Sequence, residues 1–566
     1  MAYTQENRII SIDTPLGAGV LLLTGLSGIE GISMPFRFEL ELVSENHTIA
    51  FEKIVGQNVT VSIQLPKGDN RFINGIISEF LQAGGGIEDD KGRHFAAYGA
   101  ILVPELWMLD VTTDSRIFQN LTAPQIVENI LTENNISYKT DLRGQYQTRE
   151  YCVQYRETDF NFVSRLMEEE GICYYFQHEA QKHTMFLADR TECHKECPNQ
   201  QTARYQLSAD GTTEDDVITG LDWKKQIRYG RYTVKDFNFT TPKVDLEASV
   251  STRYRLGPGE REAYYYPAGH TTKAEGERIA RLRMEEEETK ITMMSGSSTC
   301  RAFTSGYRFR LEDYYRGDMD QKEYVLTSVE HEASQPIKNE SPFDYSNTFV
   351  CIPYEVQYRP KRSTRKPLVM GSQTAMVVGP PGEEIYTDEY GRIKVQFHWD
   401  RLGKKDDKSS CWIRVSQVWA GPGWGAVIIP RIGHEVVVDF LEGDPDRPLV
   451  TGSVYNAINK PPYPLPDEKT KSTLKSDSSK GGGGFNEIRF EDKKGSEEIF
   501  VHGQKDYNIV VENNTTHTTV KTHTIKAEEI LVEGTKKVTI KAASSSIEID
   551  AGGITIKGSP LVKINP

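Results

Sequence analysis

The chain has 566 residues, too many for one hydrophobic core, so its length predicts about three or four domains. Its 81 acidic and 67 basic residues give a formal net charge of -14, which disfavours nucleic acid and anionic lipid as partners. The sequence has no apolar run of the roughly 20 residues that a membrane-spanning helix needs, and its seven cysteines are scattered, as expected for folding in a reducing cytoplasm.

Residues 1–365 mostly have the pattern of β-strands. Residues 36–42, F-R-F-E-L-E-L, alternate apolar and polar side chains with a period of two, as strands with one buried face do. The first residues, 1–17, lack the basic stretch, apolar block and cleavage site of a secretory signal. We therefore expect β-barrel or sandwich domains in a protein made without a signal peptide.

Three predicted helices interrupt these strands. The first begins with a capping box at Thr122 and Gln125. The second runs from about Thr158 to Glu170 and is expected to stop at Gly171 in the left-handed conformation. The third, near Ala274 to Glu288, is strongly acidic, and we expect one of its faces to be solvated.

The composition changes at 359–371, where a basic, proline-flanked segment without apolar periodicity predicts a domain boundary. Residues 371–456 contain four of the six tryptophans, predicted strands at 392–399 and 435–441, and Gly/Pro turns. Such spacing fits a small five-stranded barrel of the OB type. Residues 457–484 are rich in Pro and Lys and end in four glycines, so they are expected to be a connector.

From residue 485 to 566 the composition shifts to short β-branched pairs separated by polar residues and glycine. The pairs recur at steps of 8, 9, 7 and 8 residues, which predicts short strands joined by tight turns. Their apolar residues are expected to face the core of a needle: Ile530, Val532, Val538, Ile540, Ile547, Ile549, Ile554, Ile556, Val562 and Ile564.

One chain cannot bury this thin apolar stripe by itself, because the ordering entropy of so polar a ribbon exceeds what the stripe contributes. Three chains wound about one axis would supply the missing walls and pair the strand edges. The alternatives are an ordinary solenoid or a disordered polar end. The repeat therefore favours a homotrimer.

Three further segments carry a family resemblance: 155–176 (YRETDFNFVSRLMEEEGICYYF), 421–456 (GPGWGAVIIPRIGHEVVVDFLEGDPDRPLVTGSVYN) and 481–506 (GGGGFNEIRFEDKKGSEEIFVHGQKD). Together with 20–46, they resemble the VgrG family, the spike proteins of bacterial type VI secretion systems, in the order of that family. The resemblance implies a mainly β protein. Its expected parts are a hub of two β-barrels with inserted helices at 1–365, an OB-fold barrel at 371–456, a linker at 457–484 and a trimeric β-helix (β-prism) needle at 485–566.

The resemblance also implies function and partners. A homotrimer would cap the hexameric Hcp tube with its hub, carry a PAAR-repeat protein at its C-terminal tip, puncture the target envelope and deliver separately encoded effector or adaptor proteins. It would assemble in the bacterial cytoplasm and leave through the type VI apparatus. The interval 457–480 is too short for the lysozyme domain of the phage relative, and the end at Pro566 implies no toxin extension. The spike of a prophage or phage-like contractile particle is the alternative.

A third possibility, a hub with hidden hydrolase activity, requires catalytic groups. Gly25-Leu-Ser27-Gly28 lacks the Gly-x-Ser-x-Gly spacing of a nucleophile elbow and is expected to be a plain turn. His331-Glu332 and His434-Glu435 lack the second histidine of a zinc protease, so both are expected to lie in strands. We therefore predict no catalytic residue and no cofactor.

Two histidine groups could in principle bind metal. Cys193, His194 and Cys197, with His178 and His183 upstream, offer zinc ligands, but their spacing is not that of common zinc sites. His517 and His523 could present imidazoles to an ion on a threefold axis, although solvent-facing side chains are the simpler expectation. We predict no metal site.

Overall fold

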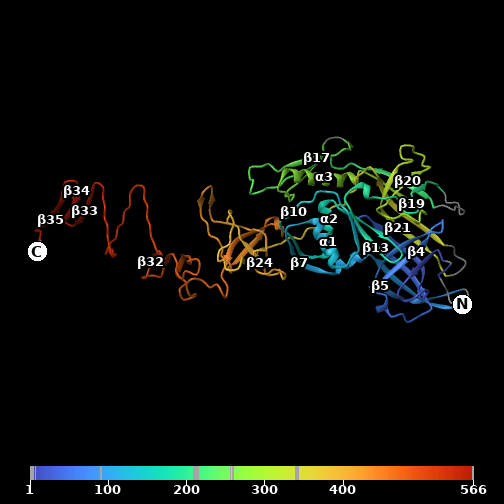
Figure 1. The fold of residues 1–566 in the computed structure, drawn as a ribbon, viewed down its shortest axis with the longest axis horizontal. Coiled ribbons are helices and arrows are strands. Elements are labelled where there is room, and N and C mark those ends of the chain that lie inside the picture. Colours follow the sequence, from blue (N-terminus) through green and yellow to red (C-terminus); the bar gives the residue numbers. More distant parts are fainter. Residues whose placement is uncertain are drawn as a thin grey trace. The chain divides into compact units, whose positions relative to one another are not determined.

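The computed structural model describes residues 5–6, 8–89, 92–207, 216–254, 256–257, 260–337 and 343–563. The chain is mainly β and divides into two units, Met1–Pro461 and Pro462–Pro566 (Figure 1). No helix within the described ranges has the length and apolar character needed to cross a membrane.

A 12-stranded sheet frames the hub, in the order β1-β4-β5-β6-β3-β2-β21-β22-β19-β15, with β20 paired to β21 and β14 to β20. Its two halves meet where β2 runs antiparallel to β21. The strands are β1 (Ile10–Asp13), β2 (Leu22–Gly31), β3 (Met34–Ser44), β4 (Asn58–Gln64), β5 (Asn70–Glu88), β6 (His94–Val103), β14 (Thr202–Arg204), β15 (Ile218–Lys225), β19 (Thr292–Ser298), β20 (Arg308–Glu312), β21 (Glu323–Ser334) and β22 (Asp344–Pro353).

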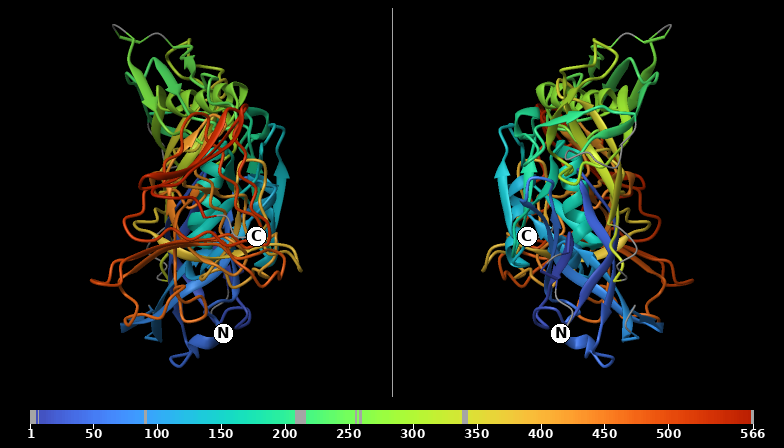
Figure 2. Two further views of the ribbon diagram at one scale, coloured as in Figure 1. Left: turned by 90° about the vertical axis from the view of Figure 1, so that its left-hand side faces the viewer. Right: turned by 90° about the vertical axis from the view of Figure 1, so that its right-hand side faces the viewer.

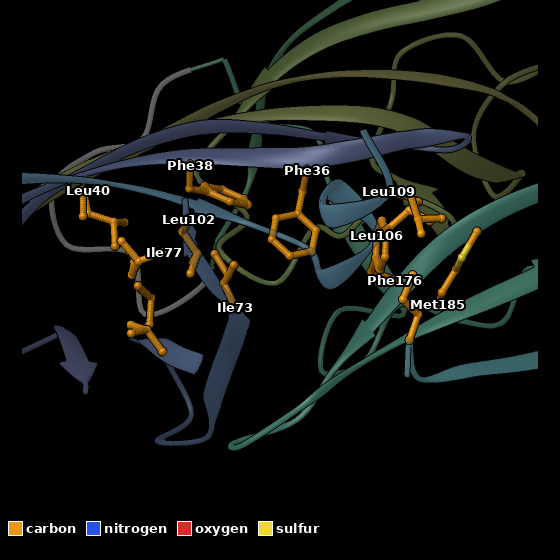
Figure 3. Close-up of a cluster of buried hydrophobic side chains, with 14 of the residues drawn as sticks. Phe36, Phe38, Leu40, Ile73, Ile77, Leu102, Leu106, Leu109, Phe176 and Met185 are labelled. Carbon is orange, nitrogen blue, oxygen red and sulfur yellow. The ribbon is translucent and has the colours of Figure 1, made fainter. Parts of the chain in front are cut away.

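Strand β3 follows the alternation expected for 36–42. Phe36, Phe38, Leu40 and Leu42 are buried, while the residues between them are exposed. Figure 3 shows the first three of these side chains among apolar side chains of β5, β6 and the short 3-10 helix η2 (Glu105–Val111). The expected turn at Gly25–Gly28 is wrong, because these residues lie inside β2 and pair with both β3 and β21.

Two helices confirm their predicted ends. Helix α1 (Ala123–Glu133) begins at a capping box in which Gln125 N donates to Thr122 Oγ1 at 3.4 Å and Thr122 N donates to Gln125 Oε1 at 2.9 Å. Helix α2 (Asp159–Glu170) is capped by Thr158 and ends at Gly171, whose φ of 70° lies in the left-handed region that glycine adopts readily.

Smaller elements complete this part of the hub. They are the 3-10 helices η1 (Phe51–Lys53) and η3 (Thr191–Cys193), and the strands β7 (Thr113–Phe118), β8 (Leu121–Thr122), β9 (Tyr138–Asp141), β10 (Thr148–Arg149), β11 (Cys152–Thr158), β12 (Cys173–His178) and β13 (His183–Ala188). β12, β13 and β9 form one sheet, while β7 pairs with β11 and β8 with β10.

Helix α3 (Lys273–Thr289) packs against a three-stranded sheet of β16 (Arg231–Val234), β17 (Ala248–Ser251) and β18 (Glu262–Tyr265). In both views of Figure 2 this green layer lies apart from the blue strands of the large sheet. The solvated acidic face expected for this helix is wrong at its C-terminal end, because Glu286, Glu287 and Glu288 are 8%, 7% and 3% exposed. Glu287 pairs with Arg228 and Lys290, and Glu288 pairs with Arg253.

Residues 373–454 form the barrel, a five-stranded sheet in the order β24-β23-β28-β29-β25. Two backbone hydrogen bonds between Ile393 and Ile413, of 2.9 and 2.8 Å, bring its edge strands together. The elements are β23 (Gln373–Val378), β24 (Lys394–Phe397), β25 (Arg414–Val415), β28 (Glu435–Phe440), the 3-10 helix η4 (Leu441–Gly443), β29 (Pro448–Val454) and the hairpin of β26 (Ala420–Gly421) and β27 (Trp424–Gly425).

The second unit has two separate antiparallel sheets. The first contains β30 (Lys471–Lys475), β31 (Glu487–Glu491) and β32 (Glu498–His502), and the second contains β33 (Lys537–Ala542), β34 (Ser545–Asp550) and β35 (Gly553–Lys557). The segment 457–484, expected to be only a connector, therefore contributes a strand. β30 has little apolar character of its own and is held by its pairing with β31.

Candidate oligomerisation surface and hub–barrel junction

Within a single chain, the β30–β32 sheet has an exposed apolar face and a covered polar face. Its register aligns Leu474 with Ile488 and Val501, and Ser472 with Phe490 and Ile499, so these six side chains share one face. The five apolar side chains of this face, here called the proximal face, are all exposed: Leu474 (66%), Ile488 (47%), Phe490 (45%), Ile499 (71%) and Val501 (48%).

The opposite face of this sheet is covered and polar. Tyr463 Oη donates to Glu487, and Arg489 donates to Tyr463 Oη at 2.8 Å while its guanidinium lies 4.4 Å from the Phe500 ring centroid. Glu487 is only 4% exposed. A soluble sheet normally buries its apolar face and exposes its polar face. The reversed arrangement indicates that the proximal face is completed by another molecule.

The β33–β35 sheet also exposes its apolar face. Val538 is aligned with Ile549 and Ile554, and Ile540 with Ile547 and Ile556, so six predicted core residues share one face, here called the distal face. Ile540, Ile547, Ile549, Ile554 and Ile556 are 62%, 39%, 43%, 67% and 55% exposed. The other face carries polar and charged side chains, including the ion pair of Lys537 with Glu548.

The remaining predicted needle residues lie outside these strands. Ile530 and Val532 are 55% and 68% exposed in a segment without secondary structure, and Val562, 43% exposed, follows β35. Ile564 lies outside the described residues. That all ten side chains point toward a common axis remains a prediction.

Between the two sheets, residues 505–536 make no backbone–backbone hydrogen bond within the described part of the chain. Every residue of this segment is exposed. Unpaired backbone groups along such a length are a template for strand pairing with another chain. The segment thus offers to a partner the hydrogen bonds that it does not make internally.

The residues of the proximal face are not among the predicted core residues of the needle. Residues 487–491 (E-I-R-F-E) and 498–502 (E-I-F-V-H) contain the period-two alternation that would have identified two of its strands. β30 carries no such signal, because only Leu474 in it is strongly apolar.

The hub and the barrel share a hydrophobic core. Tyr151, Val153 and Tyr155, in and next to hub strand β11, are buried in one cluster with barrel residues such as Val377 and Val436. Polar contacts reinforce this junction: Gln373 Nε2 donates to Tyr155 Oη at 2.8 Å, Gln119 Nε2 donates to the Lys408 carbonyl at 2.6 Å, and Arg401 pairs with Asp114 at 2.8 Å.

Ion pairs connect the basic segment at the expected boundary to the barrel. Lys366 Nζ lies 2.7 Å from Asp444 and 2.6 Å from Asp446, and Asp446 also accepts from Val153 N at 2.6 Å. Burial alone lowers the pKa of Lys366, but the two aspartates outweigh it and raise this pKa above its usual value. Lys366 therefore stays charged where hub and barrel meet.

The same basic segment binds the acidic ends of the hub helices. Ser363 N and Thr364 N each donate to Glu168 at 2.9 Å, and Arg359 pairs with Glu285 at 2.8 Å. Other buried carboxylates pair with hub residues, as Glu170 does with Arg149 and Arg278, both at 2.7 Å. The glutamates at the C-terminal ends of α2 and α3 therefore pair with basic and polar groups inside the protein. The boundary segment is ordered by these contacts.

Inside the hub, Glu30, Arg71 and His331 form a buried charged cluster. Glu30 pairs with Arg71, and His331 Nε2 lies 3.0 Å from Glu30 while its Nδ1 lies 2.8 Å from Tyr345 Oη. Burial raises the pKa of Glu30, but Arg71 and His331 outweigh it and lower the pKa to about 2. The side chain of His331 is fully buried, with both ring nitrogens occupied, so the cluster stabilises the fold and offers no group to a substrate.

The cysteine–histidine group considered for zinc does not converge. Cys193 Sγ donates to the Asp141 carbonyl at 3.4 Å and Cys197 Sγ to the Ala302 carbonyl at 3.1 Å, while His194 Nδ1 lies 2.9 Å from the Gly306 carbonyl. His183 accepts from Glu105 N through Nε2. Among the described residues, no three His, Cys, Asp or Glu side chains are placed to hold a metal ion.

Comparison with protein families divides the chain into three matched regions. Residues 29–337 match the phage tail baseplate hub family, residues 383–455 match the type VI secretion system/phage-baseplate injector OB domain, and residues 472–559 match the bacteriophage T4 gp5 C-terminal trimerisation domain. These matches confirm the expected fold class. The proximal face and the β33–β35 sheet both lie within the region that matches the trimerisation domain.

Relatives match most of the chain. The type VI secretion system spike protein VgrG1b of Pseudomonas aeruginosa is 41% identical over 524 residues, covering 91% of this chain and 70% of the relative. VgrG1a of the same organism is 40% identical over 517 residues, covering 90% and 79%. A solved E. coli type VI secretion component with structural similarity to T4 tail proteins gp27 and gp5 has the same fold, with a TM-score of 0.56 at 22% identity, covering 79% of this chain and 99% of that chain.

Proposed function

The chain belongs to the VgrG family of type VI secretion system spike proteins, and from this we propose that it works as a homotrimer whose needle is completed only between chains. The observation that carries the proposal is that both three-stranded sheets of the second unit have an exposed apolar face. Both present their apolar residues to solvent and keep their charges on the other face. Full burial of a Val, Leu, Ile or Phe side chain contributes about 1.5–3 kcal/mol, so three copies of these faces provide a large driving force for association.

Light scattering on the purified full chain tests this proposal. We expect a mass of 192 kDa, that of three chains of 64.0 kDa each. A 64.0 kDa particle at micromolar concentration would remove the basis of the proposal.

We further propose that the hub caps an Hcp tube. The likeness to the phage tail baseplate hub implies two similar barrels in each hub, so a trimer would present six of them to a hexameric tube. We expect electron microscopy of the purified trimer mixed with Hcp hexamers to show Hcp bound at the hub end of the spike. Binding of Hcp through the needle end would contradict this proposal.

At the opposite end, we propose that the needle tip binds a PAAR-repeat protein and that effectors are separate proteins carried by the spike. Strand β35 and the residues that follow it would form the platform once three chains associate. Pull-down from a secreting strain with a tagged chain should recover the tip protein and cargo together with the trimer. Their recovery with the hub and barrel after removal of 537–563 would place the binding site elsewhere.

A further inference from the structure

We propose that the β30–β32 sheet is the site at which three chains first associate, and that strand pairing of residues 505–536 follows that contact. This inference rests on the proposed trimer and adds an order of assembly and a named first interface, the proximal face. The partner it requires is a second copy of the same chain. Three observations support it.

First, this sheet can form within one chain before any partner arrives. β31 pairs with β30 and with β32 through five aligned residues each, and only residues 492–497 separate β31 from β32. Short connections make such pairings fast, because little chain entropy is lost on closing the loop. Tyr463, which lies outside the sheet, adds support to the polar face through its hydrogen bonds with Glu487 and Arg489.

Second, residues 505–536 cannot order in the same way. They have no strand partner and no backbone–backbone hydrogen bond within the described chain, so fixing them in one chain costs entropy without compensation. They gain partners only when copies of the chain are already held side by side. Ordering of this segment therefore comes after association.

Third, the β33–β35 sheet is a weaker starting point. Most of its residues on both faces are exposed, and among the described residues no side chain from outside the sheet hydrogen-bonds to it as Tyr463 does to Glu487 of β31. Isolated small sheets without a packed layer are marginally stable in water. The distal face is thus presented intermittently by a single chain, whereas the proximal face is presented continuously.

The chemistry of the proximal face favours a copy of itself as the occupant. It contains five apolar side chains and Ser472, while the charged residues of these strands lie on the opposite face. A face without charges has no means to select a charged partner but packs well against identical faces around a threefold axis. The match of 472–559 to a trimerisation domain makes it continuous with the rest of that interface.

The test compares three full-length variants during refolding. Ile488→Glu places a charge on the proximal face, Ile547→Glu places the same charge on the distal face, and Lys494→Glu changes an exposed residue in the turn between β31 and β32 as a control. Each protein is diluted from urea at micromolar concentration, cross-linked at timed intervals and resolved by mass. Circular dichroism of each variant monitors folding of the hub and barrel.

We expect Ile488→Glu to slow trimer formation at least tenfold, and Ile547→Glu and Lys494→Glu to form trimers within twofold of the wild-type rate. Equal slowing by Ile488→Glu and Ile547→Glu, or greater slowing by Ile547→Glu, would overturn the proposed order while leaving the trimer intact. A wild-type chain that stays monomeric would instead contradict the proposed function. If Ile488→Glu precipitates, the milder Ile499→Ala should still slow association more than Ile549→Ala, and the reverse ranking would overturn the proposal.

Discussion

Lys366 lies where the hub meets the barrel, and its ammonium group pairs with Asp444 and Asp446 of the barrel. Because Asp446 binds both Lys366 Nζ and Val153 N, Asp446→Ala leaves a largely buried ammonium with one partner fewer and a backbone N–H without its acceptor. We expect a loss of about 2–4 kcal/mol in the free energy of unfolding. Urea denaturation followed by tryptophan fluorescence measures this loss.

Arg401→Ala is the matched control, since its ion pair with Asp114 also joins hub and barrel but the Arg401 side chain is 70% exposed. Its removal should cost less than about 1 kcal/mol, as exposed pairs do. Similar losses for the two variants would mean that burial does not distinguish these contacts.

Four histidines of the hub have a lowered pKa, and we expect them to make the hub sensitive to acid. Burial lowers the pKa of His178, His194 and His331 to about 4 and that of His183 to about 3. The unfolded chain takes up protons on these groups below about pH 6.5, whereas the folded chain does not, so stability is full above that pH and falls as the pH drops toward 4. Each histidine contributes a slope of up to about 1.4 kcal/mol per pH unit within this window.

Urea unfolding of the hub transition at pH 7.5, 6 and 5 tests the sign. We expect the midpoint to decrease at each step, and the low pKa of Glu30 to add to the loss only at still lower pH. A constant midpoint between pH 7.5 and 5 would contradict the assignment of neutral, buried histidines.

At the scale of elements, the two faces of β35 have different expected roles: one belongs to the interface between chains and the other faces outward. Ile556 aligns with Ile547 on the distal face, whereas Lys557 aligns with Ser546 on the other face. Ile556→Asp should place three like charges in a closed core and disrupt the last strands, at a cost of several kcal/mol unless the carboxylates protonate. The variant should elute as a trimer but lose the tip protein in a pull-down, while Lys557→Asp retains it. Equal behaviour would show that the assigned faces are wrong.

The elements that the sequence predicted well are those with a local signal. The cap at Thr122, the stop at Gly171 and the alternation of 36–42 each depend on residues close in the chain. The acidic face of α3 was misread because partners of its carboxylates come from distant residues, as Arg359 does for Glu285 and Arg253 for Glu288. Local charge density indicates exposure only when no opposite charge is brought in by the fold.

The two halves of the needle illustrate the same limit. Regular spacing made Val538 to Ile556 visible as strand residues, and the structure aligns them on one face. The role of β30 could not be predicted, because a strand with one strongly apolar side chain is defined by its neighbour and not by its own pattern. The shared core of hub and barrel was equally invisible, since Tyr151, Val153 and Tyr155 precede the barrel by more than 200 residues.

At the scale of the whole molecule, the proposed trimer should resist dissociation. Separating chains that share strands requires unfolding residues 505–563, so subunit exchange is governed by an unfolding barrier. Trimers carrying two different tags, mixed at room temperature, should remain unmixed over days. Mixed trimers within an hour would indicate chains that dock by their surfaces only.

The two exposed apolar faces also affect how a newly made chain behaves before it associates. Until it meets its copies, the chain displays two uncovered apolar faces and a long unpaired backbone, the features that promote aggregation of nascent proteins. The time that a chain spends unassociated falls steeply as the local concentration of copies rises, since a trimer needs three chains. Translation of several chains from one messenger RNA would keep copies of the chain close together, and we expect this local concentration, more than the average concentration in the cell, to favour association over aggregation.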